Sequence, residues 1–301
     1  MMPHDLIPAS GAATRPHVRP GESAWRELCS TLNRLRRDEG GWWSKIEADA
    51  EAVPRIDVSG VVVRLRGNVF AEIGLRGGEP QCRIEPGHLL LTHPGGRTVL
   101  GDGVACARSV QTLSELAEHY DHVRRHACRH VDRRQAILDR LFLRHVCVLA
   151  LDAPLEAPLD AGRVDLVALS PQGVAVLFLL RRYADGDLRL KGRGGIVWRM
   201  REMDRRLADQ AAASAWVSGL LERGAALDTR HSRRYRLPPS LHVHPYVRLL
   251  IVDFDHAQRQ AGLPSLRADL ERGLDRSGAR SDIHCLGDAG NISFGTFFFG
   301  L

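Results

Sequence analysis

The stretch from Gly162 to Leu207 reads GRVDLVALSPQGVAVLFLLRRYADGDLRLKGRGGIVWRMREMDRRL. It opens with two apolar runs, Val164 to Leu169 and Val174 to Leu180, separated by Pro171-Gln172-Gly173. Pro and Gly between two β-forming runs indicate a turn, so this stretch predicts a β-hairpin. Because both runs are apolar on both faces, we expect the hairpin to lie deep in a sheet.

Further predicted elements flank the hairpin on both sides. A strand is expected over 146–151, and a long amphipathic helix over 198–221. The remaining predicted elements are a strand over 246–254, a helix over 266–274, and strands over 282–286 and 292–298. Helices and strands that alternate without a regular repeat indicate a mixed sheet flanked by helices.

The first half of the chain has a different pattern. Residues 1–21, with several prolines among small residues, predict a flexible leader, and a helix is expected over 23–37. Short strands that would form a small antiparallel sheet are predicted over 55–66, 69–75, 81–85 and 88–92, and one or two helices over 112–143. We therefore expect an α+β protein with an N-terminal module over 22–110, connecting helices over 111–145 and a second domain over 146–301.

The chain has 301 residues and a formal net charge of +6. Nearly all of the positive charge is arginine, since Lys45 and Lys191 are the only lysines. A GC-rich genome accounts for much of this bias, but arginine also binds phosphate bidentately, so the charge suits a polyanionic partner.

The cysteines and the apolar runs narrow the class of protein. None of the six cysteines forms a C-x-x-C pair, the first residues contain no secretory signal, and no apolar run is long enough to span a bilayer. These features predict a cytoplasmic, bacterial-type protein with free thiols and no membrane association. They leave the oligomeric state open.

The hairpin and its flanks resemble the PD-(D/E)XK, or restriction-endonuclease-like, nuclease superfamily. Asp165, preceded by Arg163-Val164, matches the aspartate of the family's first hairpin arm, and the second arm ends in the basic pair Arg181-Arg182. The resemblance implies a restriction-endonuclease-like core over 146–301. In that family the aspartate and the glutamate of an E-x-K tripeptide hold Mg²⁺, and the lysine activates the attacking water.

The sequence departs from this pattern at the other polar positions. The E-x-K tripeptide falls on Leu179-Leu180-Arg181, where leucine cannot bind a cation and the guanidinium keeps its proton. The phrase that often follows in the next helix reads Gly195-Ile196-Val197-Trp198-Arg199, and a glutamate of the preceding helix would fall near Arg133-Arg134. We therefore expect a nucleic-acid-binding, nuclease-like protein without the standard catalytic centre.

Two alternatives remain open. The chain could be an active Mg²⁺-dependent deoxyribonuclease with displaced residues, in which Asp165 and Glu156 bind the metal while Arg181 and Lys191 assist catalysis. Asp160 and Glu202 are further candidates for a displaced carboxylate. It could instead be a protein-interaction subunit of a defence or repair complex. Mg²⁺ is the one cofactor expected, and only if the chain is active.

Clustered arginines are the candidate contacts to nucleic acid, with DNA as the expected ligand. The predicted set is Arg182, Arg199, Arg201, Arg205, Arg233 and Arg234. Solvated surface charge would explain the same clusters. One predicted helix also carries a row of histidines, His119, His122, His126 and His130. Such spacing can bind Zn²⁺, but a polar helix flank is the simpler interpretation.

Overall fold

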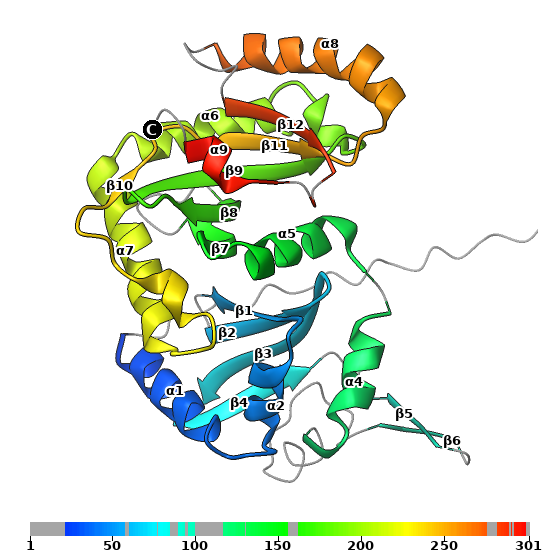
Figure 1. Cartoon of the computed structure of the whole chain (residues 1–301), viewed down its shortest axis with the longest axis vertical. Coiled ribbons are helices and arrows are strands. Elements are labelled where there is room, and N and C mark those ends of the chain that lie inside the picture. Colours follow the sequence, from blue (N-terminus) through cyan, green and yellow to red (C-terminus); the bar gives the residue numbers. More distant parts are fainter. Residues whose placement is uncertain are drawn as a thin grey trace, which may run out of the picture.

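The computed structural model describes residues 22–57, 60–76, 78–84, 90–93, 96–99, 117–129, 131–155, 162–275, 282–288, 290 and 292–298. The predicted leader, residues 1–21, lies outside these described residues. The fold is mixed α+β, as predicted: an antiparallel four-stranded sheet comes first, and a mixed six-stranded sheet flanked by helices follows (Figure 1).

The N-terminal part consists of two helices and a meander of strands. The helices are α1 (Glu22–Leu35) and α2 (Trp42–Ala48), and the strands are β1 (Ala52–Asp57), β2 (Gly60–Leu65), β3 (Asn68–Arg76) and β4 (Glu79–Ile84). Each strand pairs with the next in antiparallel register. Buried side chains of both helices and of the sheet, among them Leu32, Trp43 and Phe70, share one apolar cluster.

Two predictions for these strands are wrong. The Val-rich segment 55–66 is not one strand but parts of β1 and β2, which pair with Asp57 opposite Gly60. Two short apolar strands with a brief connection give the same alternating pattern as one long strand, so the pattern hides the turn. The predicted strand over 88–92 does not join this sheet, since β5 (Leu90–His93) pairs with β6 (Gly96–Val99) in a separate two-stranded sheet.

Within its described residues, the connecting segment contains two helices, α4 (Tyr120–Ala127) and α5 (Arg133–Arg144). The second begins at Asp132, whose side chain accepts a hydrogen bond of 3.1 Å from the Gln135 backbone N–H. A carboxylate in this position compensates the first backbone donors of the helix and explains why α5 starts there. Figure 1 shows α5 between the two larger sheets.

The predicted hairpin is confirmed and lies inside the larger sheet. Its arms are β8 (Gly162–Leu169) and β9 (Val174–Arg182), and the other strands are β7 (Val148–Leu155), β10 (His242–Val243), β11 (Arg248–Val252) and β12 (Ile283–Gly287). The strand order is β12-β11-β9-β8-β7, with β10 beside β9. β7, β8 and β9 are antiparallel, whereas β9, β11 and β12 are parallel.

Helices cover both faces of this sheet, which is why β9 is apolar on both sides. Leu177 and Leu179 face one cluster, which contains side chains of α6 (Ile196–Leu207), α7 (Gln210–Ala226) and α8 (His256–Leu274). Val176 and Phe178 face the other, which contains side chains of α5 and α9 (Phe294–Phe298). The short helices η2 (Gly186–Leu188) and η3 (Ser232–Tyr235) lie in the connections.

Two helix predictions and one strand prediction need correction. The expected helix over 198–221 is two helices, because Asp209 interrupts it and accepts a hydrogen bond of 3.0 Å from Ala212 N–H as the cap of α7. The helix predicted over 266–274 begins earlier, at His256, behind a capping box that includes Asp255; the internal Pro264 conceals this continuity. The strand predicted over 292–298 is in part the helix α9, since a short apolar run does not distinguish strand from helix.

The two halves of the chain are joined by buried polar contacts and by α7. Arg64 of β2 donates to Asp139 of α5 at 3.0 Å, and the Gly67 backbone N–H donates to the same carboxylate at 2.6 Å. α7 extends from the larger sheet to α1, where Asn33 donates to the carbonyl of Ala226 at 3.2 Å (Figure 1). Among the described helices, none combines the length and the apolar content that crossing a bilayer requires.

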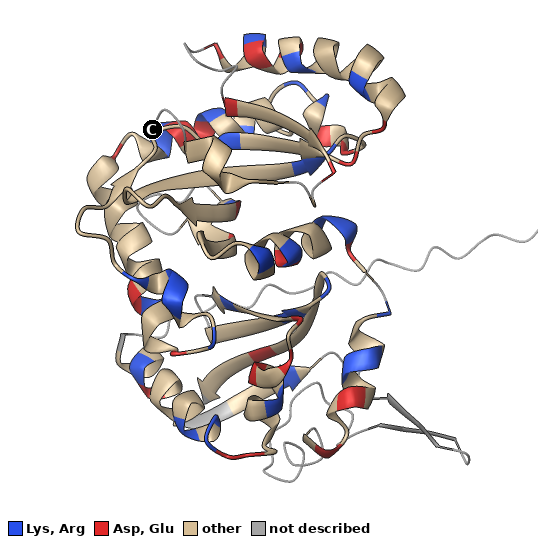
Figure 2. Cartoon of the chain, viewed as in Figure 1, with Lys and Arg blue, Asp and Glu red and all other residues tan. Residues whose placement is uncertain are grey.

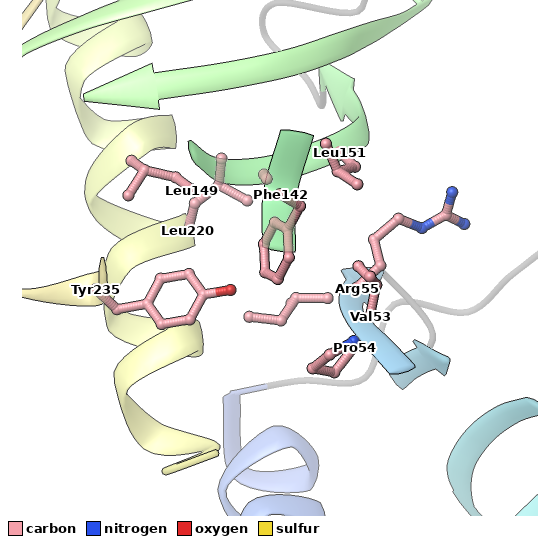
Figure 3. A pocket seen from close by; sticks show the side chains of 10 residues that line it. Val53, Pro54, Arg55, Phe142, Leu149, Leu151, Leu220 and Tyr235 are labelled. Atoms are coloured by element: carbon pink, nitrogen blue, oxygen red, sulfur yellow. The ribbon is translucent and has the colours of Figure 1, made fainter. Parts of the chain in front are cut away.

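A small cavity lies at this junction, between β1, β7 and α7 (Figure 3). Its volume is about 10 Å³, and Val53, Phe142 and Leu220 are among the apolar side chains around it. The hydroxyl of Tyr235 points toward it, and burial raises the pKa of this phenol to about 12. A space of this size holds about one water molecule, so it is a packing feature of the junction rather than a ligand site.

Candidate functional site

The site begins at Asp165, in the first arm of the hairpin. Its side chain is 3% exposed, and each of its oxygens accepts hydrogen bonds. Oδ2 accepts from the backbone N–H of Leu180 and from Nη1 of Arg181, both at 2.8 Å, and Oδ1 accepts from Nη2 of Arg134. The carboxylate is therefore neutralised by two guanidinium groups from different elements, β9 and α5.

Arg181 extends the cluster on its other side. Its side chain is 4% exposed, and its Nε donates to Oδ2 of Asp187 at 2.5 Å. Arg134, Asp165, Arg181 and Asp187 thus form a chain of alternating charges. Burial disfavours the charged form of Arg134, but the attraction of Asp165 prevails and raises the pKa of that guanidinium above its ordinary value.

Arg199, on α6, borders the same cluster. It donates a hydrogen bond to the carbonyl of Arg163 on β8. Burial lowers the pKa of Arg199 from its ordinary value, while the Asp165 carboxylate raises it and the Arg181 guanidinium lowers it further. This side chain, predicted as a phosphate contact, lies mainly against the protein's own backbone and charges.

The occupied lone pairs of Asp165 bear on the predicted metal site. A Mg²⁺ ion would have to displace at least one guanidinium from this carboxylate, at the cost of leaving that cation without its partner. Glu156 and Asp160 lie outside the described residues. Within the part of the chain that the structure describes, no group of three or more His, Cys, Asp or Glu side chains could hold a metal ion.

The remaining candidates for catalysis lie in other surroundings. Leu179, which the resemblance aligned with a metal-binding glutamate, is fully buried in the apolar cluster with side chains of α6 and α8. Lys191 is exposed in the loop before α6. Glu202 on α6 binds Arg205 and, at 3.1 Å, Arg206, and the hydrogen bond from Arg206 is the main cause that lowers the pKa of this glutamate.

The predicted phosphate contacts do not share one environment. Arg201, Arg205 and Arg233 are exposed, and Arg205 pairs with Glu202. Arg182 is partly exposed and lies 3.8 Å from a carboxylate oxygen of Asp253. η3 follows α7, whereas α6 precedes it, so about 25 Å of helix separates the two predicted clusters along the chain.

Arg234 is the clearest departure from the prediction, because it is only 7% exposed. Its Nη1 donates to the carbonyls of Phe142 at 3.0 Å and Val148 at 2.8 Å, and its guanidinium lies 3.8 Å from the centre of the Phe142 ring. This arginine therefore holds η3 against α5 and β7. Composition favours an exposed arginine by default, and no local pattern indicates burial.

An exposed aromatic side chain was missed. Trp198 of α6 is 41% exposed, and Arg201 and Arg205 follow it at helical spacing on the same face. The exposed loop before α6 adds Lys191 and Arg193. The available signal was that Trp198 lies outside the spacing of Met200, Met203 and Leu207, which form the buried stripe.

The cluster of Trp198 with the cations of α6 and of the preceding loop matters because the charged residues of the chain are otherwise dispersed. In the view of Figure 2, basic and acidic residues are interspersed over the helices around the larger sheet. The net charge of +6 therefore does not by itself locate a binding face.

The row of histidines forms a ring pair within the described residues. The ring centres of His122 and His126, one turn apart on α4, lie 4.5 Å from each other. His130 lies outside the described residues. The pair packs ring on ring, which suits the interpretation as a polar helix flank.

Comparisons with protein-family models, with curated proteins and with solved structures produced no match to this chain.

Proposed function

We propose that this chain is a nucleic-acid-binding protein with a PD-(D/E)XK-like core that does not cleave by the standard metal-dependent mechanism. The observation that carries the proposal is the Asp165 carboxylate, which is occupied by Arg134 and Arg181. Guanidinium groups occupy the carboxylate oxygens that a metal ion would need. The hairpin would thus keep the aspartate of the family but not its metal-binding role. A cytoplasmic location is part of this proposal.

The positions of the neighbouring side chains support the resemblance. Asp165 and Arg181 are separated by sixteen positions in the sequence, yet they are in direct contact across adjacent strands. Arg134 comes from the helix before these strands, which is where the resemblance places a further polar residue. Under the resemblance, Asp165 stands at the aspartate position, Arg181 at the lysine position and Arg134 near the glutamate of the preceding helix, and these three side chains are in contact.

The surface that would contact nucleic acid is the exposed face of α6 with the loop before it. Trp198 can stack on a base, while Arg201 and Arg205 on the same face can bind phosphates. Lys191 and Arg193 extend the positive charge along the loop. An exposed tryptophan among cations is the combination that single-stranded nucleic acid requires, so single-stranded DNA is the first ligand to test.

The test compares two triple variants of the full chain by fluorescence anisotropy with labelled single-stranded DNA, duplex DNA and RNA. One variant replaces Lys191, Arg193 and Arg201 with alanine. If each side chain contacts one phosphate, the affinity should fall at least about tenfold, and the slope of log K against log salt should decrease by about 2 to 3. These side chains are exposed, so the fold should be retained.

The matched control removes the same charge elsewhere, through Arg37→Ala, Arg129→Ala and Arg140→Ala. These side chains are also exposed. An equal loss of nucleic-acid affinity in both triple variants would show that net charge, and not the α6 surface, drives binding. Absence of binding to all three ligands at low salt would refute the proposal.

Cleavage is tested separately with plasmid and single-stranded DNA in the presence of Mg²⁺ or Mn²⁺. We expect the wild-type chain and Asp165→Asn to give the same background. Cleavage that Asp165→Asn abolishes, with its fold intact, would instead support a displaced catalytic centre.

A further inference from the structure

A second, larger cavity lies at the hairpin turn, away from the Asp165 cluster. Its volume is about 590 Å³. It is open to solvent, and four segments line it: the α5–β7 connection, the β8–β9 turn, η3 with the residue after it, and α9 with the residue before it. This volume falls within the range of sites that bind small organic molecules, about 300 to 1,000 Å³.

The wall of this cavity is positively charged. Arg233, Arg234 and Arg236 line it, and no aspartate or glutamate is among its described lining residues. Arg233 and Arg236 are exposed, and neither takes part in an ion pair within the described residues. Exposed guanidinium groups that converge on one hollow without a carboxylate favour an anionic occupant.

Arg234 strengthens this argument because it is 93% buried. Backbone carbonyls and the Phe142 ring surround its guanidinium, and its Nε has no hydrogen-bond partner within the described residues. Carbonyl dipoles and an aromatic face offset part of the cost of a buried cation, but no neighbouring carboxylate neutralises it. An anion in the adjoining cavity would lower that cost.

The same cavity also has apolar and aromatic side chains in its lining. Phe294 and Phe298 of α9 line it together with Leu169 and Pro171; Phe294 is only 2% exposed, whereas Phe298 is partly exposed. Gln172, from the β8–β9 turn, adds an exposed amide to the lining, while the hydroxyl of buried Ser170 accepts a hydrogen bond of 3.0 Å from the Val174 backbone N–H. A lining that combines aromatic rings, arginines and an amide suits a ligand that has a planar ring and a separate anionic group.

We propose that this cavity binds a mononucleotide, with its phosphate on Arg233 and Arg236 and its base against Phe298. The inference does not depend on the nucleic-acid-binding surface of α6, because the two sites share no residue. The cavity is a binding site rather than a thiolate centre, since burial raises the pKa of Cys147, in its wall, to about 11 and keeps that thiol protonated.

The test uses isothermal titration calorimetry on the full chain. The probes are the 5′-mono- and triphosphates of adenosine, guanosine, cytidine and uridine, with the parent nucleosides and inorganic phosphate as controls. We expect at least one nucleotide to bind with a stoichiometry near one and the nucleosides to bind at least about tenfold more weakly, because they lack the charged group.

Variants assign the binding to this cavity. Arg233→Ala with Arg236→Ala should weaken nucleotide binding about tenfold or more, and Phe298→Ala should weaken it as well. Arg37→Ala with Arg129→Ala is the control of equal charge, and the triple variant at Lys191, Arg193 and Arg201 should also keep full nucleotide affinity. Thus failure of the α6 surface and failure of this cavity are distinguishable.

Two results would overturn the inference. The first is no binding of any nucleotide up to millimolar concentration, or binding that the Arg233 and Arg236 replacements leave unchanged. The second is binding of an oligonucleotide, but of no mononucleotide, that requires these two arginines; the cavity would then accept a strand end.

Discussion

Asp165→Ala should destabilise the protein strongly, whether or not the chain is an enzyme. The replacement removes the acceptor of three hydrogen bonds, from Arg134, Arg181 and the backbone of Leu180. It leaves the guanidinium of Arg181, which is 4% exposed, with Asp187 as its remaining carboxylate. A loss of activity in this variant would therefore not identify a catalytic role without a measurement of stability.

The expected loss of unfolding free energy follows from the contacts that Arg134 and Arg181 keep in Asp165→Ala. Removing one partner from a buried ion pair costs about 3–5 kcal/mol. Arg181 keeps the bond to Asp187, and Arg134, which is 30% exposed, keeps its hydrogen bond to the Leu180 carbonyl and reaches water. We therefore expect a loss near the lower limit, about 3 kcal/mol, which corresponds to a decrease of roughly 6–12 °C in Tm for a large domain.

The assay is urea denaturation followed by circular dichroism, with calorimetry for Tm. The informative companion is the double variant Asp165→Leu with Arg181→Met, which replaces the pair with apolar side chains of similar volume. It should recover at least about 1 kcal/mol relative to Asp165→Ala, because the buried cation is removed as well. Asp187→Ala, at a carboxylate that is 28% exposed, should cost only about 1 kcal/mol or less.

A loss below about 1 kcal/mol for Asp165→Ala would refute this reasoning, because the carboxylate would then behave like a surface group. Mg²⁺ gives a second check. A site that binds the ion in the folded state would raise Tm with increasing Mg²⁺, and this increase would vanish in Asp165→Asn. We expect no such dependence.

Three further predictions concern pH, a glycine and a helix cap. Burial lowers the pKa of His284 to about 4 and, together with adjacent arginines, that of His231 to about 3. In the unfolded chain the pKa of each imidazole is near 6.5. The free energy of unfolding is therefore highest above pH 6.5 and falls toward pH 4 by about 1.4 kcal/mol per pH unit for each histidine. His284→Gln should flatten the curve of urea midpoint against pH. Gly67→Ala should lower Tm more than Gly40→Ala, although both glycines have positive φ. A Cβ at Gly67 would lie 2.5 Å from a backbone oxygen of the α5 cap, whereas a Cβ at Gly40 would have no other atom within 4 Å. Asp209→Ala should cost about 1 kcal/mol in urea denaturation through loss of the α7 cap, and an unchanged midpoint would show that tertiary contacts alone separate α6 from α7.

Local patterns in the sequence predicted most of the secondary structure. The β8–β9 hairpin was predictable because its two apolar runs enclose a Pro and a Gly, and α1 because its apolar residues recur at helical spacing. The errors share one cause. The β1–β2 turn, the interruption at Asp209 and the helix α9 depend on one or two residues within longer apolar patterns, and only packing decides between the alternatives.

The site was predictable as a set of residue types but not as a set of contacts. The sequence indicated that Asp165 would lie in the hairpin without the expected glutamate and lysine. It did not indicate that Arg134 and Arg181 would bind the carboxylate, because Arg134 lies 31 positions away on another element. It also could not distinguish Arg234, buried in the interior, from its exposed neighbour Arg233.

What the sequence determined by itself is therefore the hairpin, its position among helices, and the presence of leucines and arginines, without glutamate or lysine, at the end of its second arm. Only the tertiary structure decided that Asp165 is an acceptor for arginines, that Trp198 is exposed beside Arg201, and that three arginines, with no carboxylate among the described lining residues, line a cavity. The physical reason is that periodicity depends on neighbours along the chain, whereas burial and charge pairing depend on groups that folding brings together from distant segments.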